Sequence, residues 1–263
     1  MTQQMPPLAD SPASAPPGPP PRPWGIWATL GFSLIILVVF VAISIVTSVV
    51  IVTLGHVAGV SVFADTRSEA LASNGLLLAV IFIASAPPCS GLILLFAWLR
   101  RKRYPLPDYL GFHKPTARSL AGWVAATVAL VIATDVTTYL LGRPVVPAFM
   151  VDVYKTSLFP PLLIVVLVVL GPAFEELFFR GFLFEGFRRS FLGAWVTVVL
   201  TAAGWAAIHT QYDWYGIGVI LAGGLLLGTA RLCTNCIWVC MAMHATTNVV
   251  ATAEAMVKVH LLG

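Results

Sequence analysis

Seven long apolar runs constrain the fold of this chain more than any other feature of its sequence. The first, from Gly25 to Gly55, contains no charged residue. A helix needs about 20 predominantly apolar residues to cross the hydrocarbon core of a bilayer. Short polar or Gly/Pro-marked connections separate the runs, which cover roughly residues 25–55, 76–99, 119–142, 160–189, 193–210, 216–231 and 235–257. The runs predict an all-α fold, a polytopic transmembrane helical bundle of seven or eight spans.

The composition supports a membrane protein and argues against several other classes. Hydrophobic residues make up 59% of the chain and charged residues 10%, whereas soluble domains average about 25% charged residues. The net charge of +4 is modest. The basic residues form no patch interleaved with aromatic residues that could follow a phosphate backbone, so nucleic acid is excluded as a partner. We expect the lipid bilayer to surround most of the chain.

The chain divides into a short tail and one domain. Residues 1–23 are rich in Pro, Ala and Ser, a composition that predicts a disordered tail. Residues 24–263 are expected to form a single transmembrane helical domain. No basic segment precedes the first run, which is too long for the apolar part of a signal peptide, so it predicts an uncleaved first span. We expect Pro87 and Pro88 to kink the second helix, and Gly171 with Pro172 to interrupt the fourth.

The distribution of Lys and Arg predicts the orientation in the membrane. Positive residues gather on the cytoplasmic side of membrane proteins. Eleven of the 15 basic residues fall on the side of the N-terminus: Arg22, Arg100, Arg101, Lys102, Arg103, Lys114, Arg118, Arg180, Arg188, Arg189 and Arg231. Four fall on the other side: Arg67, Arg143, Lys155 and Lys258. This bias predicts an integral, multi-pass protein of the plasma membrane with a cytoplasmic N-terminus and tail.

Two adjacent carboxylates lie inside the fourth apolar run. Ionisable residues within a span are costly, so they indicate a functional site by default. Glu176 and Arg180 are four residues apart and share a helix face, which predicts an ion pair. Glu175 points about 100° away and must find a partner on another helix or in water. The alternative is that Glu175, Glu176 and Arg180 form one structural ion-pair cluster.

Two later runs contain polar residues that match these carboxylates. Trp205 and His209 are four residues apart, as are His244 and Asn248, so each pair shares one helix face. A helix rises 1.5 Å per residue. We assume that the fourth run is helical to its end. The distance along the helix axes from one end of the bundle is then about 14–24 Å for each of four residues: Glu175, His209, His244 and Asn248. The sequence therefore predicts that these four residues meet in one layer.

Asp135 is a weaker candidate in the third run. It is flanked by Thr134, Thr137 and Thr138. Either these hydroxyl groups satisfy the carboxylate locally, or Asp135 lines a substrate cavity.

At these residues the sequence resembles the membrane-embedded CAAX protease and bacteriocin-processing family, also called the CPBP or Abi family. The resemblance covers roughly residues 160–250 and rests on three motifs in the family's order and spacing. The family usually has Phe where this chain has Trp205. The motifs EExxxR, FxxxH and HxxxN appear as Glu175-Glu176 with Arg180, Trp205 with His209, and His244 with Asn248.

The resemblance implies an intramembrane endopeptidase that cleaves a membrane-associated protein or peptide, including prenylated, CAAX-like substrates. It implies that Glu175 and His209 activate a water molecule, while His244 and Asn248 stabilise the oxyanion of the tetrahedral intermediate. Glu176, Arg180 and Trp205 would support the site.

Two questions stay open at this point. The glutamate scheme needs no cofactor, but zinc is an alternative with Glu175, His209 and His244 as its ligands. The function itself has two alternatives. The chain is either a noncatalytic membrane scaffold or regulator of the same family, or a proton- or cation-coupled transporter that uses the buried residues as a relay.

Overall fold

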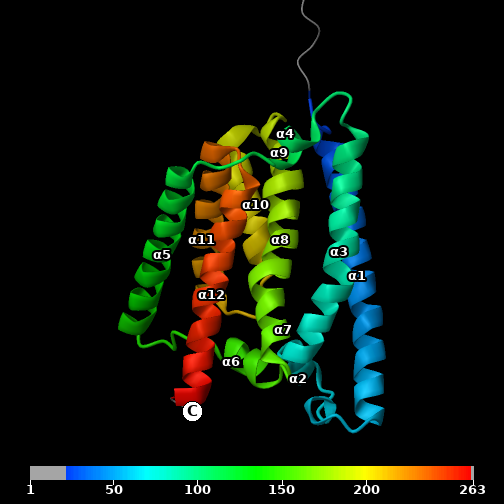
Figure 1. Ribbon diagram of the computed structural model, residues 1–263, viewed down its shortest axis with the longest axis vertical. Coiled ribbons are helices and arrows are strands. Elements are labelled where there is room, and N and C mark those ends of the chain that lie inside the picture. Colours follow the sequence, from blue (N-terminus) through cyan, green and yellow to red (C-terminus); the bar gives the residue numbers. More distant parts are fainter. Residues whose placement is uncertain (1–21, 262–263) are drawn as a thin grey trace, which may run out of the picture.

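The structure, a computed structural model, describes residues 22–261 of the chain. Residues 1–21 of the predicted tail lie outside the described residues. Throughout the described range the regular elements are helices, which run up and down in a single bundle (Figure 1). The predicted all-α helical bundle is confirmed.

Each of the seven apolar runs forms a helix close to its predicted bounds. The main helices are α1 (Ile26–Val57), α3 (Gly75–Leu99), α5 (Ala117–Leu140), a long helix over residues 160–188, α10 (Gly193–Ala207), α11 (Trp214–Thr234) and α12 (Ile237–Leu261). The long helix comprises α7 (Pro160–Val165), η2 (Val166–Leu170), α8 (Gly171–Glu176), η3 (Leu177–Leu183) and α9 (Phe184–Arg188). Short elements fill the connections: η1 (Ser61–Phe63), α2 (Ser68–Ala72), α4 (Leu106–Leu110) and α6 (Ala148–Lys155).

Five helices are long and apolar enough to cross a membrane: α1, α3, α5, the long helix and α11. Helix α10 is apolar but shorter, and α12 has the length of a span with a more polar sequence. Large apolar side chains of α1 such as Leu34, Val46 and Leu54 are about 60% exposed. An apolar surface of this kind suits lipid rather than water. The chain is therefore an integral, multi-pass membrane protein.

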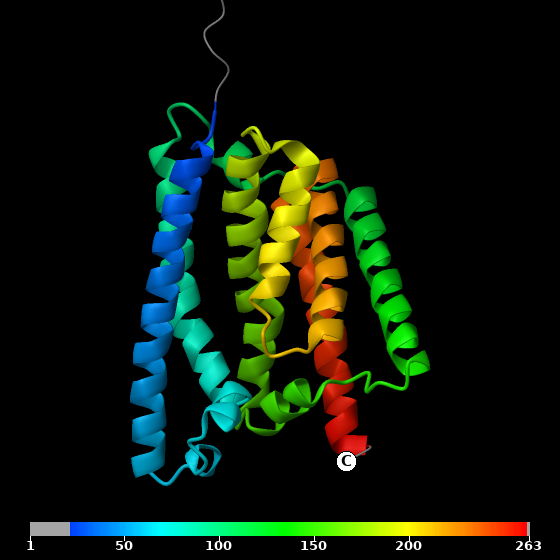
Figure 2. The same cartoon turned by 180° about the vertical axis from the view of Figure 1, so that it is seen from behind.

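The helices form a central group with two flanks (Figures 1 and 2). The long helix, α10, α11 and α12 lie at the centre. Helices α1 and α3 pack on each other along one side, and α5 lies at the opposite edge against α12 and α11. Six of the seven site residues predicted from the sequence lie in the long helix, α10 and α12, and His209 follows the end of α10.

The two predicted proline effects differ in outcome. Helix α3 contains Pro87 and Pro88 and changes direction along its length (Figure 2). The prediction that Gly171 and Pro172 interrupt the fourth helix is wrong, because the helix continues through them. Its winding changes instead: π-helical turns occupy residues 166–170, directly before Gly171, and residues 177–183. A wider turn accommodates the proline, which cannot donate a backbone hydrogen bond.

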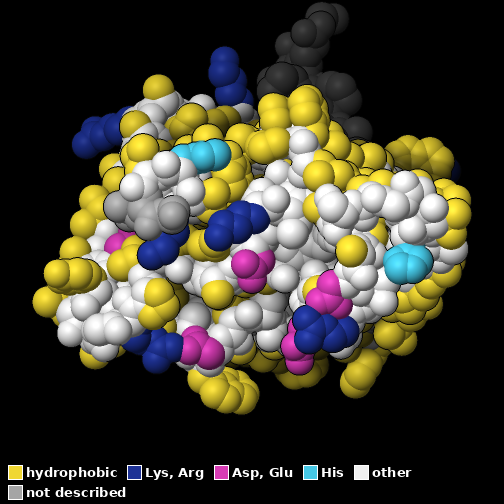
Figure 3. Space-filling view, turned by 90° about the horizontal axis from the view of Figure 1, so that it is seen from below, with side chains coloured by type: hydrophobic (Ala, Val, Ile, Leu, Met, Phe, Trp, Pro, Cys, Tyr) yellow, Lys and Arg dark blue, Asp and Glu magenta, His cyan; other side chains and the backbone are white. Residues whose placement is uncertain are grey.

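Two of the arginines counted for the orientation lie inside the bundle. Arg180 and Arg231 are fully buried inside the bundle, so they carry no information about which side faces the cytoplasm. The other nine basic residues still gather at the end where α1 begins. At the opposite end Arg67 pairs with Asp65 and Arg143 with Asp213. Figure 3 shows basic and acidic side chains spread over that end.

Helix α3 approaches α6 so closely that only glycine fits at the contact. A Cβ atom at Gly75 would lie 1.9 Å from the carbonyl oxygen of Val153. Because a backbone atom cannot move aside like a side chain, we expect Gly75→Ala to lower the stability by about 1–3 kcal/mol. Gly91→Ala is the matched control, since a Cβ at Gly91 of the same helix meets nothing within 4 Å. Thermal unfolding of both variants in detergent measures the difference, and equal midpoints would contradict this account of the contact.

Candidate active site

The carboxylate of Glu176 lies at the centre of the buried polar residues. Its Oε1 accepts hydrogen bonds from Arg180 Nη1 at 3.2 Å and from His244 Nδ1 at 2.9 Å. Glu176 and Arg180 are completely buried, and His244 is 5% exposed. Arg180 also donates to the carbonyl oxygen of Gly224 on α11. The predicted Glu176–Arg180 pair is confirmed, and the structure adds a link to α12 through His244.

Glu175 finds its partner on another helix. Its Oε2 accepts a hydrogen bond from the indole Nε1 of Trp205 on α10 at 2.6 Å. Because an indole N–H is only a donor, this bond fixes one carboxylate oxygen and leaves Oε1 free. The two neighbouring glutamates are thus in different situations: Glu176 is surrounded by buried cationic or donor groups, whereas Glu175 is half-buried and faces a cavity.

His209 lies just beyond the end of α10. Its Nδ1 is 2.7 Å from the carbonyl oxygen of Trp205. A carbonyl oxygen can only accept a hydrogen bond, so Nδ1 carries the hydrogen and, in the neutral ring, Nε2 keeps a free lone pair. The imidazole packs edge-on against the Trp205 ring, with 5.0 Å between the ring centroids. Trp205 therefore orients both Glu175 and His209.

Asn248 contacts the π-helical part of the long helix. Its Nδ2 donates to the carbonyl oxygen of Leu167 at 2.7 Å. In a π-helix this carbonyl would accept from the residue five positions later, which is Pro172 and has no N–H. Asn248 supplies the missing donor. One amide hydrogen and the amide oxygen of Asn248 remain for other partners.

The side chains predicted to meet in one layer line a single cavity of about 320 Å³. Glu175, His209, His244 and Asn248 are all part of its wall, together with Trp205. A larger hollow of about 790 Å³ lies at the arginine-rich end and contains none of these side chains. A cavity with a few convergent polar groups among apolar side chains is the usual form of an active site.

The three ligands of the zinc alternative, Glu175, His209 and His244, are not gathered around one point in this structure. Among residues 22–261 no three His, Cys, Asp or Glu side chains are placed to hold one metal ion. Of the three candidate ligands, Glu175 is bound to Trp205 and His244 to Glu176. Both imidazole rings also pack edge-on against Trp205. The side chains would have to rearrange to bind an ion together.

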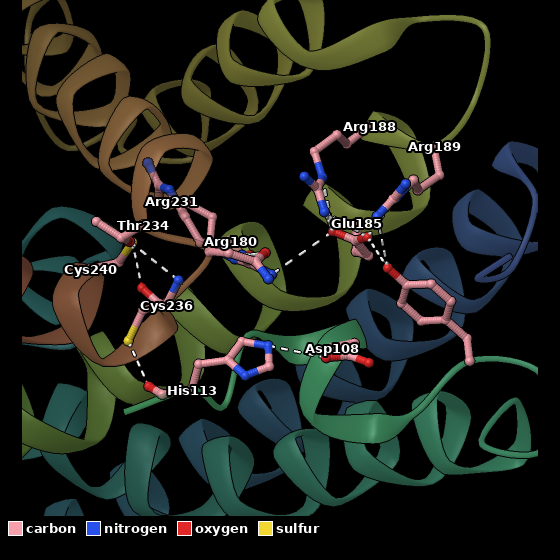
Figure 4. Close-up of polar contacts among 12 residues, drawn as sticks. Asp108, His113, Arg180, Glu185, Arg188, Arg189, Arg231, Thr234, Cys236 and Cys240 are labelled. Atoms are coloured by element: carbon pink, nitrogen blue, oxygen red, sulfur yellow. Dashed lines mark hydrogen bonds and ion pairs between the residues drawn. The ribbon is translucent and has the colours of Figure 1, made fainter. Parts of the chain in front are cut away.

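A second buried carboxylate, Glu185, was not recognised in the sequence. It is completely buried and accepts hydrogen bonds from Arg188, Arg189 and the hydroxyl of Tyr104 (Figure 4). Burial and the bond to Glu185 raise the pKa of Tyr104, so its hydroxyl stays protonated and donates. The spacing of Arg188 and Arg189, three and four residues after Glu185, was the available signal.

Arg231 connects this second cluster to the site. Its Nε donates to the carbonyl oxygen of Arg180 at 2.7 Å, and its Nη2 lies 3.9 Å from Glu185 Oε2. Gly111, with a φ of +78°, lets the backbone approach the Arg231 guanidinium. Arg231 thus holds the backbone of Arg180 from α11. Because it is completely buried, Arg231 does not mark one side of the membrane.

The fold and the site define an integral membrane protein with a glutamate and histidine cavity inside its helical bundle. Residues 157–250 match the family described as Rce1-like, type II CAAX prenyl endopeptidase Rce1-like. This range runs from the start of the long helix to the middle of α12 and contains all three motifs. This part of the chain is therefore similar to the CAAX protease family that the motifs resemble. No curated protein and no solved structure matches the chain.

The buried pair predicts a coupled effect on stability. Arg180→Met leaves Glu176 without its cationic partner, and we expect a loss of about 3–5 kcal/mol, as for other broken buried pairs. Adding Glu176→Gln to the same chain removes the uncompensated charge, so the double variant should be less destabilised than the sum of the two single variants. Unfolding in detergent of all four proteins measures the coupling. Additive losses would show that the two side chains do not form a pair.

Proposed function

We propose that this protein is an intramembrane endopeptidase that hydrolyses a peptide bond of a membrane-associated protein or peptide. The observation that carries the proposal is the cavity in which Glu175 and His209 face the same space as His244 and Asn248. The family of residues 157–250 supports a protease of the CAAX type. Prenylated, CAAX-like peptides are therefore among the substrates to test.

Glu175 and His209 are proposed to activate water. In this scheme the water oxygen attacks the carbonyl carbon of the substrate, and Glu175 takes the proton that the water loses. The free lone pair on His209 Nε2 accepts the second hydrogen of the water and orients the attacking oxygen. Glu175 then returns its proton to the amine nitrogen as the C–N bond breaks. No cofactor is needed in this scheme.

His244 and Asn248 are proposed to stabilise the oxyanion. Asn248 has one amide hydrogen left after its bond to Leu167. The Nδ1–H of His244 is held by Glu176, so its ring donates to the oxyanion through Nε2 as an imidazolium. The Glu176 carboxylate, which Arg180 also contacts, accepts this Nδ1–H and helps to stabilise the protonated ring, as the aspartate does in a catalytic triad. Fixed donors in a water-poor cavity are worth several kcal/mol in the transition state.

The site is proposed to lie in a plasma-membrane protein whose N-terminus is cytoplasmic. Nine basic residues at the end where α1 begins support this orientation. The cavity extends away from that end, towards Val145 and Pro147 in the connection from α5 to α6 and Met150 in α6.

We expect Glu175→Gln to lower the rate of peptide cleavage by about 10²-fold or more, because the amide cannot take a proton from water. The amide oxygen can still accept the hydrogen bond from Trp205, so the variant should unfold at the wild-type temperature. Asp152→Asn, which changes an exposed carboxylate on α6, is the control with wild-type activity. The assay uses the purified full-length protein with a panel of lipidated and transmembrane peptides, and mass spectrometry locates each cut. Cleavage that persists in Glu175→Gln would refute the mechanism.

A chelator separates the glutamate scheme from the zinc alternative. We expect cleavage to continue at the same rate after dialysis against a chelator, because no three His, Cys, Asp or Glu side chains among residues 22–261 are placed to hold one metal ion. Loss of cleavage that zinc restores would replace the glutamate scheme. If no peptide is cut while a partner protein still binds the Glu175→Gln variant, the chain acts as a scaffold.

A further inference from the structure

A second hollow, separate from the active-site cavity, lies at the end of the bundle where α1 begins. It has a volume of about 790 Å³. Three guanidinium side chains line it, those of Arg22, Arg100 and Arg189, and no Asp or Glu from residues 22–261 belongs to its wall. They come from the segment before α1, the end of α3 and the end of the long helix. The fold therefore gathers these charges from three distant parts of the chain.

Contacts with the protein fix the Arg100 guanidinium at the hollow. Its Nε donates to the carbonyl oxygen of Arg22 at 3.2 Å, and its Cζ lies 4.9 Å from the centroid of the Trp24 ring. Trp24 is itself held to α3, because its indole Nε1 donates to the carbonyl oxygen of Phe96 at 2.8 Å. The bond to Arg22 uses only Nε, so both Nη groups of Arg100 remain as donors for a ligand.

Arg189 is fixed in the same way at the end of the long helix. Its Nε donates to the buried carboxylate of Glu185 at 3.1 Å, and its Nη2 donates to the hydroxyl of Tyr104 at 3.3 Å (Figure 4). These bonds leave Nη1 as a donor. Glu185 also pairs with Arg188. Two guanidinium groups thus share one carboxylate, and a positive charge is left over beside the hollow.

Two exposed aromatic side chains indicate the level of the hollow in the membrane. Trp27 of α1 and Phe191 both line it, and they are 80% and 83% exposed. Tryptophan is enriched where the hydrocarbon core of a bilayer meets the headgroups. The hollow therefore lies at the level of the lipid headgroups.

An apolar stripe on α1 runs from the hollow along the bundle. Trp27, Leu30, Leu34 and Val38 are all exposed. Their spacing of three or four residues places them on one helix face. The helix rises about 16 Å from Trp27 to Val38, roughly half of the hydrocarbon thickness of about 30 Å. An acyl chain of one leaflet fits along this stripe while its headgroup reaches the arginines.

We propose that the hollow binds the headgroup of an anionic membrane phospholipid. The side chains of Arg22, Arg100 and Arg189 bind its phosphate, and its acyl chains lie against the exposed face of α1. Guanidinium groups bind phosphate oxygens through paired N–H donors, and basic pockets between membrane helices are suited to anionic headgroups.

Two features of the hollow make the site selective. Arg100 and Arg189 are already held in place, so little side-chain freedom is lost on binding. A zwitterionic headgroup carries a cation that the arginines repel, whereas an anionic headgroup carries none. Inorganic phosphate has the same anionic group but no acyl chain to cover α1. The inference is independent of the proposed peptidase function.

The experiment compares two phospholipids with identical acyl chains. Native mass spectrometry of the purified full-length protein in detergent measures its affinity for phosphatidylglycerol and for phosphatidylcholine. We expect the wild type to bind phosphatidylglycerol about tenfold or more tightly, and Arg22→Gln/Arg100→Gln to reduce this preference to about twofold or less. Arg103→Gln/Arg118→Gln is the matched control, because it removes two exposed charges from the same end and neither residue lines the hollow. It should keep the wild-type preference.

Three outcomes of this comparison would overturn the site. Equal affinity of the wild type for the two lipids would show that the hollow does not select an anionic headgroup. An equal loss of preference in both double variants would show a general effect of surface charge. Displacement of phosphatidylglycerol by an equal concentration of inorganic phosphate would show that the hollow takes a soluble anion instead of a lipid.

A second measurement locates the acyl chain on the wild type and so needs no variant to fold. Phosphatidylglycerol with a diazirine in its acyl chain is crosslinked by light, and mass spectrometry of the peptides identifies the labelled helix. We expect residues 30–38 of α1 to be labelled several-fold more than α5, which also exposes apolar side chains such as Ile132 and Val136. Unlabelled phosphatidylglycerol should suppress this label, and phosphatidylcholine should not. Equal labelling of α1 and α5 would contradict the proposal.

Discussion

The rest of the site depends on the charge of Glu176 being balanced inside the bundle. An isolated carboxylate in a low dielectric costs several kcal/mol, and the cost is offset only by well-placed partners. Arg180 from the next turn and His244 from α12 supply them, and Arg180 in turn reaches Gly224 on α11. One carboxylate thereby fixes three helices relative to one another. The positions of the cavity walls therefore depend on this contact.

The π-helical turns of the long helix explain how this contact is reached. Pro172 lies one turn before the glutamates and cannot donate to the preceding turn. The wide turn before it and the side chain of Asn248 together accommodate that loss. The second wide turn presents the Arg180 carbonyl to Arg231. Irregular backbone in a membrane helix is satisfied here by side chains from neighbouring helices.

The sequence predicted what depends on local spacing. Apolar runs gave the seven helices, and the four-residue spacing of Glu176 and Arg180 gave their pair. Contacts between helices were predicted less well, because they depend on rotation about each helix axis, which apolar runs do not specify. Three features depend on such contacts between helices: the bond of His244 to Glu176, the bond of the Trp205 indole to Glu175, and the burial of Arg231. Depth along a helix is set by rise per residue, so the common layer of site residues could be predicted.

The hydrogen bonds of the two imidazoles have a consequence for the movement of protons. His209 gives its Nδ1–H to a backbone carbonyl, and His244 gives its own to a carboxylate. Both rings thus turn the same nitrogen towards the cavity, but only one has an anion behind it. A proton gained by His244 is therefore backed by a carboxylate, whereas one gained by His209 is backed by a backbone carbonyl. This difference between the two imidazoles is present in the bundle before any substrate binds.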